Sequence, residues 1–151
     1  MSYVEHTIRP LLKKDLLPIK LLEEKIFDTD RLSLRSIKRF LSLKRHFFYG
    51  LFVEGQLAGM ILILERQNSS KVRLYSLGVS PLYEGCGFAQ LLLERGIEFY
   101  KKRKKTLLKL EVKKTNKRAI TFYEKNQFLL NGKIPSYYQD GEEALLYFLK
   151  I

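Results

Sequence analysis

Apolar positions recur with two different spacings along the chain, and the spacing separates expected helices from expected strands. Apolar residues at positions 16, 17, 19, 21, 22 and 26, and again at 34, 37, 40, 41 and 43, form patterns that are typical of an amphipathic helix against a core. Short runs rich in β-branched and aromatic residues occur elsewhere, and these are typical of strands. Two such runs flank Glu54-Gly55-Gln56, so the sequence predicts a hairpin around this turn.

These patterns predict an ordered series of elements. We expect strands at residues 6–9, 47–53, 57–66, 72–79, 107–112, 128–134 and 144–150, and helices at residues 14–27, 33–43, 88–100 and 117–125. Hairpins in the first half and a strand–helix–strand arrangement in the second predict a mixed sheet with helices on its faces. This order excludes a plain doubly wound fold.

The length and composition indicate a globular protein. With 151 residues and 46% hydrophobic side chains, residues 1–151 are expected to form one domain with a proper core. No apolar run approaches the roughly 18 residues of a membrane span, and the N-terminus does not resemble a signal peptide. Cys86 is the only cysteine, which predicts a reducing compartment such as the cytoplasm. His6 and His46 have no cysteines nearby in the sequence, so we expect no metal site.

The chain is strongly basic. Its 28 lysines and arginines against 16 acidic residues give a net charge of +12, which favours polyanionic surroundings such as RNA, ribosomes or phosphorylated cofactors. The run Lys101–Lys105 ends a predicted helix, where cations complement the negative end of the helix dipole. We interpret this run first as a solvated helix end and second as a nucleic-acid patch.

Residues 79–89 contain the most specific local pattern, Val-Ser-Pro-Leu-Tyr-Glu-Gly-Cys-Gly-Phe-Ala. A strand leads into the segment, two glycines follow at 85 and 87, and a helix is expected from Phe88. Glycines let the main chain approach a ligand closely, and the free N–H groups at a helix start attract anions. The pattern predicts a phosphate cradle, with a simple tight turn as the alternative. It lacks the lysine of a Walker loop, and Gln90 replaces the third glycine of a dinucleotide fingerprint.

The second half of the chain resembles the GNAT superfamily of acyl-CoA N-acyltransferases, best over residues 72–134. The loop of that family reads roughly Val-x-Pro-x-Tyr-Arg-Gly-x-Gly-x-Gly/Ala, and this chain matches it at Val79, Pro81, Tyr83, Gly85, Gly87 and Ala89. A second family motif is matched by Leu110-Glu111-Val112, Asn116, Ala119-Ile120, Tyr123-Glu124-Lys125 and Phe128. The segment Tyr137-Tyr138-x-Asp140-Gly141-x-x-Ala144 is similar to the ending of N-terminal acetyltransferases, notably the ribosomal-protein-alanine type.

This resemblance implies a mixed α/β GNAT fold, with a mostly antiparallel sheet and helices on both faces. The fourth and fifth strands are expected to splay apart in a V, with acetyl-CoA in the gap and no metal. The N–H of Val79 is expected to polarise the thioester carbonyl, as a preorganised donor. The cofactor-binding residues implied by the resemblance are Leu77, Gly78, Val79, Glu84, Gly85, Cys86, Gly87, Phe88, Ala89, Asn116 and Tyr123.

The resemblance also implies roles in catalysis and acceptor binding. Tyr123 is expected to be the general acid and Glu111 the general base, the alternatives being a packed aromatic ring and a solvent-facing strand residue. Asn116 is expected to contact the pantetheine arm, or only to cap its helix. Tyr137 and Tyr138 are expected to wall an acceptor slot, or to be surface turn residues.

Two positions depart from the family pattern. Glu84 stands where the family usually has Arg or Gln, so its carboxylate is expected to weaken pyrophosphate binding unless it points away. Gln127 replaces a usual glycine, which we attribute to turn chemistry.

The sequence therefore predicts an acetyl-CoA-dependent N-acetyltransferase acting on a primary amine. The favoured acceptor is a protein or peptide N-terminus, including one on a ribosomal protein, because an α-amino group has a pKa of about 8 against about 10.4 for lysine. One alternative acceptor is a small amine such as a polyamine, which a basic chain without an evident acidic cluster disfavours. Another alternative is a non-catalytic RNA- or ribosome-binding module, although no RNP1-like motif is present. We otherwise expect contact with nucleic acid only indirectly, through the ribosome or the basic surface. The sequence is compatible with a monomer and with a dimer.

Overall fold

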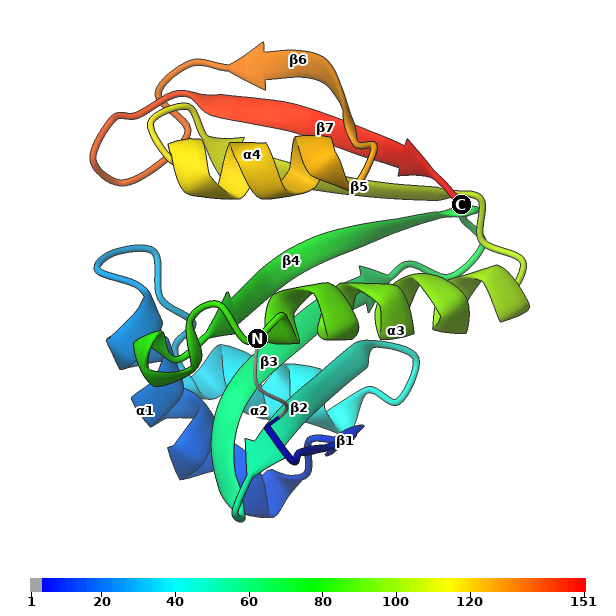
Figure 1. The fold of residues 1–151 in the computed structure, drawn as a ribbon. Helices are drawn as coiled ribbons and strands as arrows, with labels where there is room; N and C mark the ends of the chain where they lie inside the picture. Colours follow the sequence, from blue (N-terminus) through cyan, green and yellow to red (C-terminus); the bar gives the residue numbers. More distant parts are fainter. Residues whose placement is uncertain (1–3) are drawn as a thin grey trace.

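The computed structural model describes residues 4–151 as one seven-stranded sheet with helices against it (Figure 1). The strands are β1 (Thr7–Pro10), β2 (Phe47–Val53), β3 (Gln56–Glu65), β4 (Lys71–Val79), β5 (Leu107–Lys113), β6 (Leu129–Ile134) and β7 (Ala144–Lys150). The helices are α1 (Leu16–Ile26), α2 (Leu34–Ser42), α3 (Phe88–Lys102) and α4 (Lys117–Lys125), with short 3₁₀ turns at η1 (Lys13–Asp15) and η2 (Pro81–Tyr83).

The element order and type predicted from the sequence are confirmed, and the ends differ by at most two residues. The two 3₁₀ turns were not predicted, because segments of three residues leave no periodic signal. No helix in the described part of the chain is long and apolar enough to cross a membrane.

The sheet has the order β1-β2-β3-β4-β5-β7-β6. All neighbouring strands run antiparallel except β4 and β5, which run parallel because α3 carries the chain back between them. The predicted mixed, mostly antiparallel sheet is therefore confirmed.

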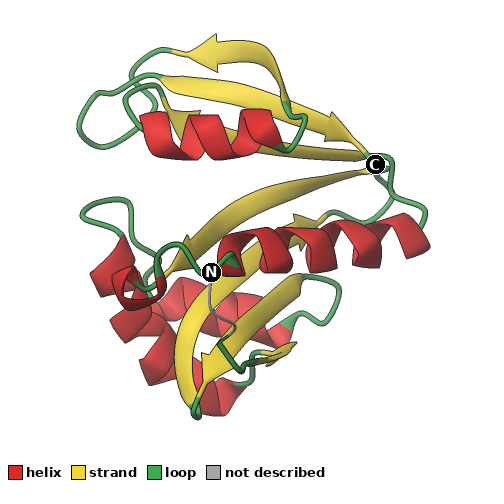
Figure 2. Ribbon diagram, in the orientation of Figure 1, coloured by secondary structure: helices red, strands yellow, loops and turns green. Residues whose placement is uncertain are grey.

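Two helical layers cover the sheet, one on each face (Figure 2). Met60 and Leu62 of β3 pack in a cluster with residues of α1 and α2, whereas Ile61 and Ile63 pack in a second cluster with residues of α3. Alternate residues of a strand point to opposite faces, so β3 is apolar from Leu57 to Leu64 because both of its faces are covered.

The strands β4 and β5 separate after a short paired segment. Their pairing runs from Lys71↔Leu107 to Arg73↔Lys109. Beyond this point β4 continues to Val79 bonded to β3, and β5 continues to Lys113 bonded to β7. The expected V-shaped splay is confirmed, and Figure 1 shows the two strands diverging toward the N-terminal ends of α3 and α4.

Candidate active site

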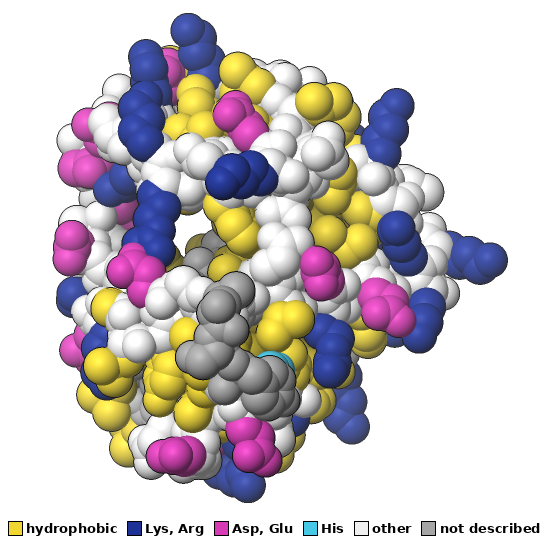
Figure 3. All heavy atoms as spheres, in the orientation of Figure 1, with side chains coloured by type: hydrophobic (Ala, Val, Ile, Leu, Met, Phe, Trp, Pro, Cys, Tyr) yellow, Lys and Arg dark blue, Asp and Glu magenta, His cyan; other side chains and the backbone are white. Residues whose placement is uncertain are grey.

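Two cavities lie along the splay. One, of about 350 Å³, is lined by β4, β5, the end of α1 and the α1–α2 loop; we call it the wedge cavity. The other, of about 530 Å³, is lined by the loop after β4, the start of α3 and α4; we call it the loop cavity. Both are lined by Ile26, Phe27, Leu77, Asn116, Ala119 and Tyr123. The cavities therefore meet at the open ends of β4 and β5, and Figure 3 shows an opening between the two halves of the molecule.

Two glycines shape the loop cavity. Gly85 and Gly87 have φ angles of 83° and 80°, in the left-handed region that glycine adopts without strain. No heavy atom lies within 4 Å of the position that a Cβ would take on either residue, so both open onto free space. Gly87 is also the N-cap of α3 and provides no side chain to cap the first N–H groups of that helix. N–H groups at an uncapped helix start can bind an anion, so the predicted phosphate cradle stays a prediction that this geometry allows.

The open edge of β4 carries further main-chain donors. The N–H of Ser80 donates to the carbonyl of Ala58 on β3, at 2.7 Å. Because successive N–H groups in an extended strand point to opposite edges, the N–H of Val79 points into the splay. Leu77, two residues earlier, has the same orientation, and both side chains line the loop cavity.

Tyr123 lies where the two cavities join. It packs edge-on against Phe122 and Phe128, with ring centroids 5.4 Å away in both cases. Its hydroxyl has no hydrogen-bond partner among residues 4–151. Burial raises the pKa of this phenol, and Tyr138 adds a smaller effect in the same direction. The group therefore keeps its proton at neutral pH, and the residue lines both cavities.

Asn116 is both a helix cap and a cavity residue. Its Oδ1 accepts a hydrogen bond from the N–H of Ala119 at 3.2 Å, which confirms the cap. The Nδ2 group makes no hydrogen bond within the described chain, so its two donors are available to a ligand.

Glu111 lies on β5 and lines the wedge cavity. Its Oε1 is 2.9 Å from the Nη2 of Arg73, and its Oε2 accepts from the Nε of Arg73 at 3.2 Å. Arg73 also donates to the hydroxyl of Tyr137, at 3.0 Å. The side chain of Glu111 is only 16% exposed, so it is not the solvent-facing strand residue of the alternative interpretation.

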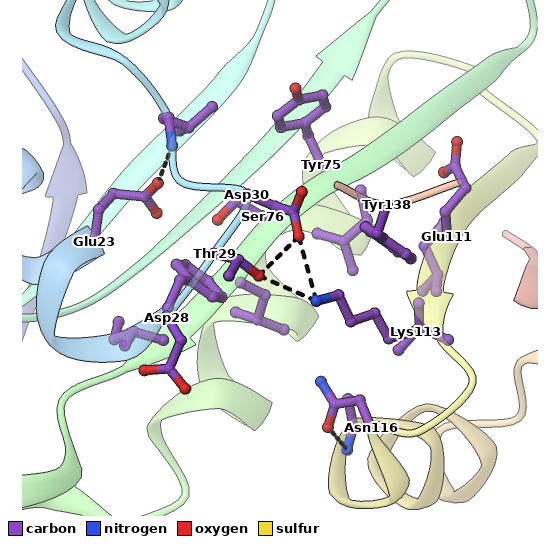
Figure 4. Close-up of a pocket in the computed structure, with 18 of the residues that line it drawn as sticks. Glu23, Asp28, Thr29, Asp30, Tyr75, Ser76, Glu111, Lys113, Asn116 and Tyr138 are labelled. Atoms are coloured by element: carbon purple, nitrogen blue, oxygen red, sulfur yellow. Dashed lines mark hydrogen bonds and ion pairs between the residues drawn. The ribbon is translucent and has the colours of Figure 1, made fainter. Parts of the chain in front are cut away.

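Lys113 is the centre of a polar network beside the wedge cavity, and Figure 4 shows its contacts with Thr29 and Asp30. Its Nζ lies 2.8 Å from Asp140 in the β6–β7 loop, 3.4 Å from Asp30 and 3.1 Å from Thr29 in the α1–α2 loop. The pKa of Lys113 is raised, first by its hydrogen bond to Asp140 and then by Asp30. One lysine of β5 thus joins the two loops that flank the cavity.

The two tyrosines of the β6–β7 loop have different positions. Tyr138 lines the wedge cavity, and its ring lies 5.2 Å from the Nζ of Lys113. Tyr137 packs edge-on against Tyr138, is 40% exposed, and lies outside both cavities while it accepts from Arg73. The two tyrosines were predicted to form one wall of the acceptor slot. In the structure only Tyr138 lines the wedge cavity, whereas Tyr137 contacts Arg73, the partner of Glu111.

Of the other residues predicted to bind the cofactor, some line a cavity and some do not. Glu84, Phe88 and Ala89 line the loop cavity with the two glycines. Gly78 and Cys86 do not line either cavity. A Cβ on Gly78 would lie 2.8 Å from Ile26, so this glycine lets α1 pack against β4. Cys86 packs instead against the core.

Glu84 does not stand alone in the loop. Its carboxylate forms an ion pair with Arg118 in the first turn of α4, across the loop cavity. The sequence alone gives no sign of this ion pair, because Arg118 is 34 residues away from Glu84 along the chain.

The structure also brings the acidic residues at positions 23–30 together with a carboxylate of β5. Glu23, Asp28, Asp30 and Glu111 all line the wedge cavity, with Lys113 as the cation. Glu23 is buried and accepts the N–H of Leu32 at 2.6 Å, and burial raises its pKa. Asp28 is exposed and makes no ion pair in the described chain, and in Figure 4 its carboxylate points away from Lys113. The acidic cluster that was not evident in the sequence therefore exists in the fold.

Comparisons with known proteins agree with this geometry. The crystal structure of the ribosomal-protein-S18-alanine N-acetyltransferase from Escherichia coli matches with a TM-score of 0.88 and 27% identity, over 97% of this chain and 94% of that chain. Ard1 from Thermoplasma volcanium matches with a TM-score of 0.91 and 22% identity, over 98% and 99%. Arabidopsis thaliana Naa50, in complex with the bisubstrate analogue CoA-Ac-MVNAL, matches with a TM-score of 0.85 and 21% identity, over 98% and 100%. The last two likenesses show the fold alone.

The sequence comparisons identify the family. No curated protein is significantly similar to the chain in sequence. The model of the acetyltransferase (GNAT) family, however, matches residues 13–128, which include β4, the glycine loop, β5 and α4. The chain therefore belongs to the GNAT family of acetyltransferases.

Proposed function

We propose that this protein transfers the acetyl group of acetyl-CoA to the α-amine of a protein or peptide N-terminus. The observation that carries the proposal is the meeting of the two cavities at Tyr123, whose hydroxyl has no partner in residues 4–151. A cofactor in the loop cavity and an acceptor in the wedge cavity would each reach that hydroxyl.

The loop cavity has features that suit acetyl-CoA, which is the acyl donor of this family. The uncapped N–H groups from Gly87 to Ala89 would hold the pyrophosphate, and the open edge of β4 at Leu77 and Val79 would pair with the pantetheine amides. The donor amide of Asn116 is available to the same arm. Bound acetyl-CoA would supply an activated thioester.

Three groups would then carry the transfer. Glu111 accepts a proton from the acceptor amine, directly or through water, so that the nitrogen attacks the thioester carbon. The N–H of Val79 stabilises the negative charge that develops on the carbonyl oxygen. As the new C–N bond forms and the C–S bond breaks, Tyr123 donates its proton to the departing sulfur. The acylated nitrogen then releases its extra proton to give the neutral amide, and a proton returns to the tyrosinate through water. Glu111 lines the wedge cavity, Val79 the loop cavity and Tyr123 both.

An N-terminal amine is supported by its chemistry and by the neighbours. Its pKa of about 8 leaves a useful neutral fraction at pH 7, whereas a lysine amine at about 10.4 would need much more help. The Escherichia coli enzyme at 27% identity acts, by its name, on the alanine of ribosomal protein S18. The wedge cavity, bordered by the α1–α2 loop and Tyr138, has the form of a slot for the first residue of a chain.

One observation favours a second candidate, a cationic small amine. Four carboxylates line the wedge cavity against one lysine, which would attract a polyamine. Glu111 and Asp30 are already paired with cations, however, so Asp28 and Glu23 remain as possible partners.

A two-step experiment tests the proposal. The melting temperature should rise with acetyl-CoA, because a ligand bound only by the folded state stabilises it. The protein should then be incubated with acetyl-CoA and either a library of peptides with free N-termini or a panel of polyamines, with product masses as the readout. Acetylation at peptide N-termini supports the proposal, acetylated polyamines support the second candidate, and the absence of both overturns the proposal.

A further inference from the structure

The loop cavity has an unusual charge arrangement around the glycines. Its charged lining residues are Lys25 of α1, Glu84 of the loop and Arg118 of α4. Arg118 and Glu84 form an ion pair, which joins the first turn of α4 to the residue just before Gly85. The guanidinium is therefore held beside the anion cradle, although the loop itself contains no basic residue between Val79 and Ala89.

We propose that Arg118 is a cofactor-binding residue that grips the pyrophosphate of acetyl-CoA, and that Glu84 holds its guanidinium in place until the cofactor arrives. This rests on the proposed function, because it concerns the same cofactor cavity. It assigns a role to α4 that main-chain binding by the glycine loop does not include.

The exchange of partners is favoured by charge and geometry. The side chains of Arg118 and Glu84 are 77% and 54% exposed, and exposed ion pairs contribute little to folding stability. A pyrophosphate carries more negative charge than one carboxylate and accepts two parallel hydrogen bonds from a guanidinium. Because Glu84 adjoins the cradle, a pyrophosphate bound at Gly85 to Ala89 would compete directly for Arg118.

Glu84 then has two opposing effects on cofactor binding. It keeps the flexible Arg118 side chain close to the cradle, but it also competes for the guanidinium and repels the phosphates. Lys117 gives a matched control, because it is a cation in the same turn of α4 and does not line the loop cavity.

Calorimetric titration with three ligands tests the proposal on the full chain. Acetyl-CoA contains the pyrophosphate and a 3′-phosphate, acetyl-dephospho-CoA retains only the pyrophosphate, and S-acetylpantetheine contains neither. Arg118→Gln should lower the affinity for acetyl-CoA and for acetyl-dephospho-CoA by about tenfold, the size of one lost charge-assisted contact. Its affinity for S-acetylpantetheine should be unchanged. Lys117→Gln should change the affinity for all three ligands little. Glu84→Gln should tighten binding of the first two ligands, because a pair this exposed holds Arg118 only weakly and the lost repulsion and competition outweigh the lost contact. The gain should be smaller in the Arg118→Gln background.

Each other result overturns the proposal. If Arg118→Gln binds acetyl-CoA with unchanged affinity, Arg118 does not contact the pyrophosphate. If only the affinity for acetyl-CoA falls, Arg118 contacts the 3′-phosphate instead. An equal loss for S-acetylpantetheine indicates a general change in the cavity. If Glu84→Gln binds acetyl-CoA more weakly, the carboxylate of Glu84 does not compete with the phosphates for Arg118. If the unmodified protein does not bind acetyl-CoA at all, the proposed function itself fails, which is a distinct outcome.

Discussion

Arg73 and Glu111 join β4 to β5 just beyond the last pair of residues in the parallel ladder, Arg73↔Lys109. The ion pair stands at the vertex of the splay, where the sheet stops being continuous. The side chains are 33% and 16% exposed, so the carboxylate is held in one orientation at the end of the wedge cavity. The same arginine reaches Tyr137, which connects the vertex to the β6–β7 loop. The candidate base is thus positioned by the strand that would bind the cofactor.

Glu111→Gln tests the base role while it keeps the size of the side chain. We expect kcat/KM for the acceptor to fall by about 10²-fold or more, since general-base catalysis is commonly of that size, with acetyl-CoA affinity unchanged. Arg73→Gln is the comparison, because it frees the carboxylate but leaves it able to accept a proton. If Glu111 served only to hold the vertex together, the two variants would lose activity equally.

Tyr123→Phe removes a proton donor and leaves the ring that packs against Phe122 and Phe128. We expect kcat to fall by about 10²-fold or more with the melting temperature nearly unchanged, because the hydroxyl has no partner to lose within residues 4–151. Tyr147→Phe is a matched control, since that hydroxyl hydrogen-bonds Glu124 at 2.8 Å and lies outside both cavities. Near-normal turnover in Tyr123→Phe would return this residue to a packing role.

Gly87→Val tests the cradle. The branched side chain would stand in the open space above the loop, and the variant should lose the thermal shift given by acetyl-CoA. Gly55→Val controls for backbone strain, because Gly55 has a similar φ of 78°, equally free space, and a place in the β2–β3 turn away from both cavities. Both variants should be less stable without ligand, but only Gly55→Val should keep the shift. A retained shift in Gly87→Val would place the anion elsewhere.

Lys113→Met tests whether the network across the wedge cavity orders the acceptor slot. Methionine keeps the apolar length of the side chain and loses the contacts to Asp30 and Asp140. We expect the KM for the acceptor to rise severalfold, with acetyl-CoA affinity unchanged, because Lys113 lines the wedge cavity and not the loop cavity. Lys114→Met, which removes an exposed cation paired with Glu143 outside both cavities, is the control. A KM equal to that of the unmodified protein would mean that the slot forms without the network.

The stability of the fold should depend on pH through His46. Burial is the main cause that lowers the pKa of this imidazole, with Arg45 adding to it, and its Nδ1 accepts the N–H of Glu65 at 3.0 Å. Between the lowered pKa and the usual value of 6.5, the unfolded chain binds a proton that the folded chain does not. The contribution of His46 is therefore complete above pH 6.5 and is lost as the pH falls through the folded pKa.

His46→Asn keeps a hydrogen-bond acceptor and removes the titration. Urea unfolding between pH 5 and 7.5 should show the free energy of unfolding of the unmodified protein falling faster on acidification than that of the variant. Glu23, whose pKa burial raises, contributes with the opposite sign in both proteins and cancels in the comparison. Parallel pH curves for the two proteins would contradict the prediction.

The sequence by itself determined the elements and the conformation of the glycine loop, because both depend on neighbours along the chain. Apolar spacing was sufficient to place α4 and β7 with the ends that the structure shows. The positive φ angles of Gly85 and Gly87 follow from local backbone sterics, so two glycines before a helix were a readable signal. The positions of Glu111 and Tyr123 followed from their place on β5 and α4 within a motif.

Only the tertiary structure decided how charges are paired. The partner of Glu84 is Arg118, that of Glu111 is Arg73, and Lys113 reaches loops on both sides of the splay. Sequence spacing does not encode such contacts, because each depends on how far β4 and β5 diverge and on which loops fold over the gap. The fold also brings Glu111 of β5 to the cavity that Glu23, Asp28 and Asp30 line, although these three residues lie about 80 residues earlier in the chain. A carboxylate has a defined task only when its neighbours in space are known, since an electrostatic interaction depends on distance and burial and not on separation along the chain.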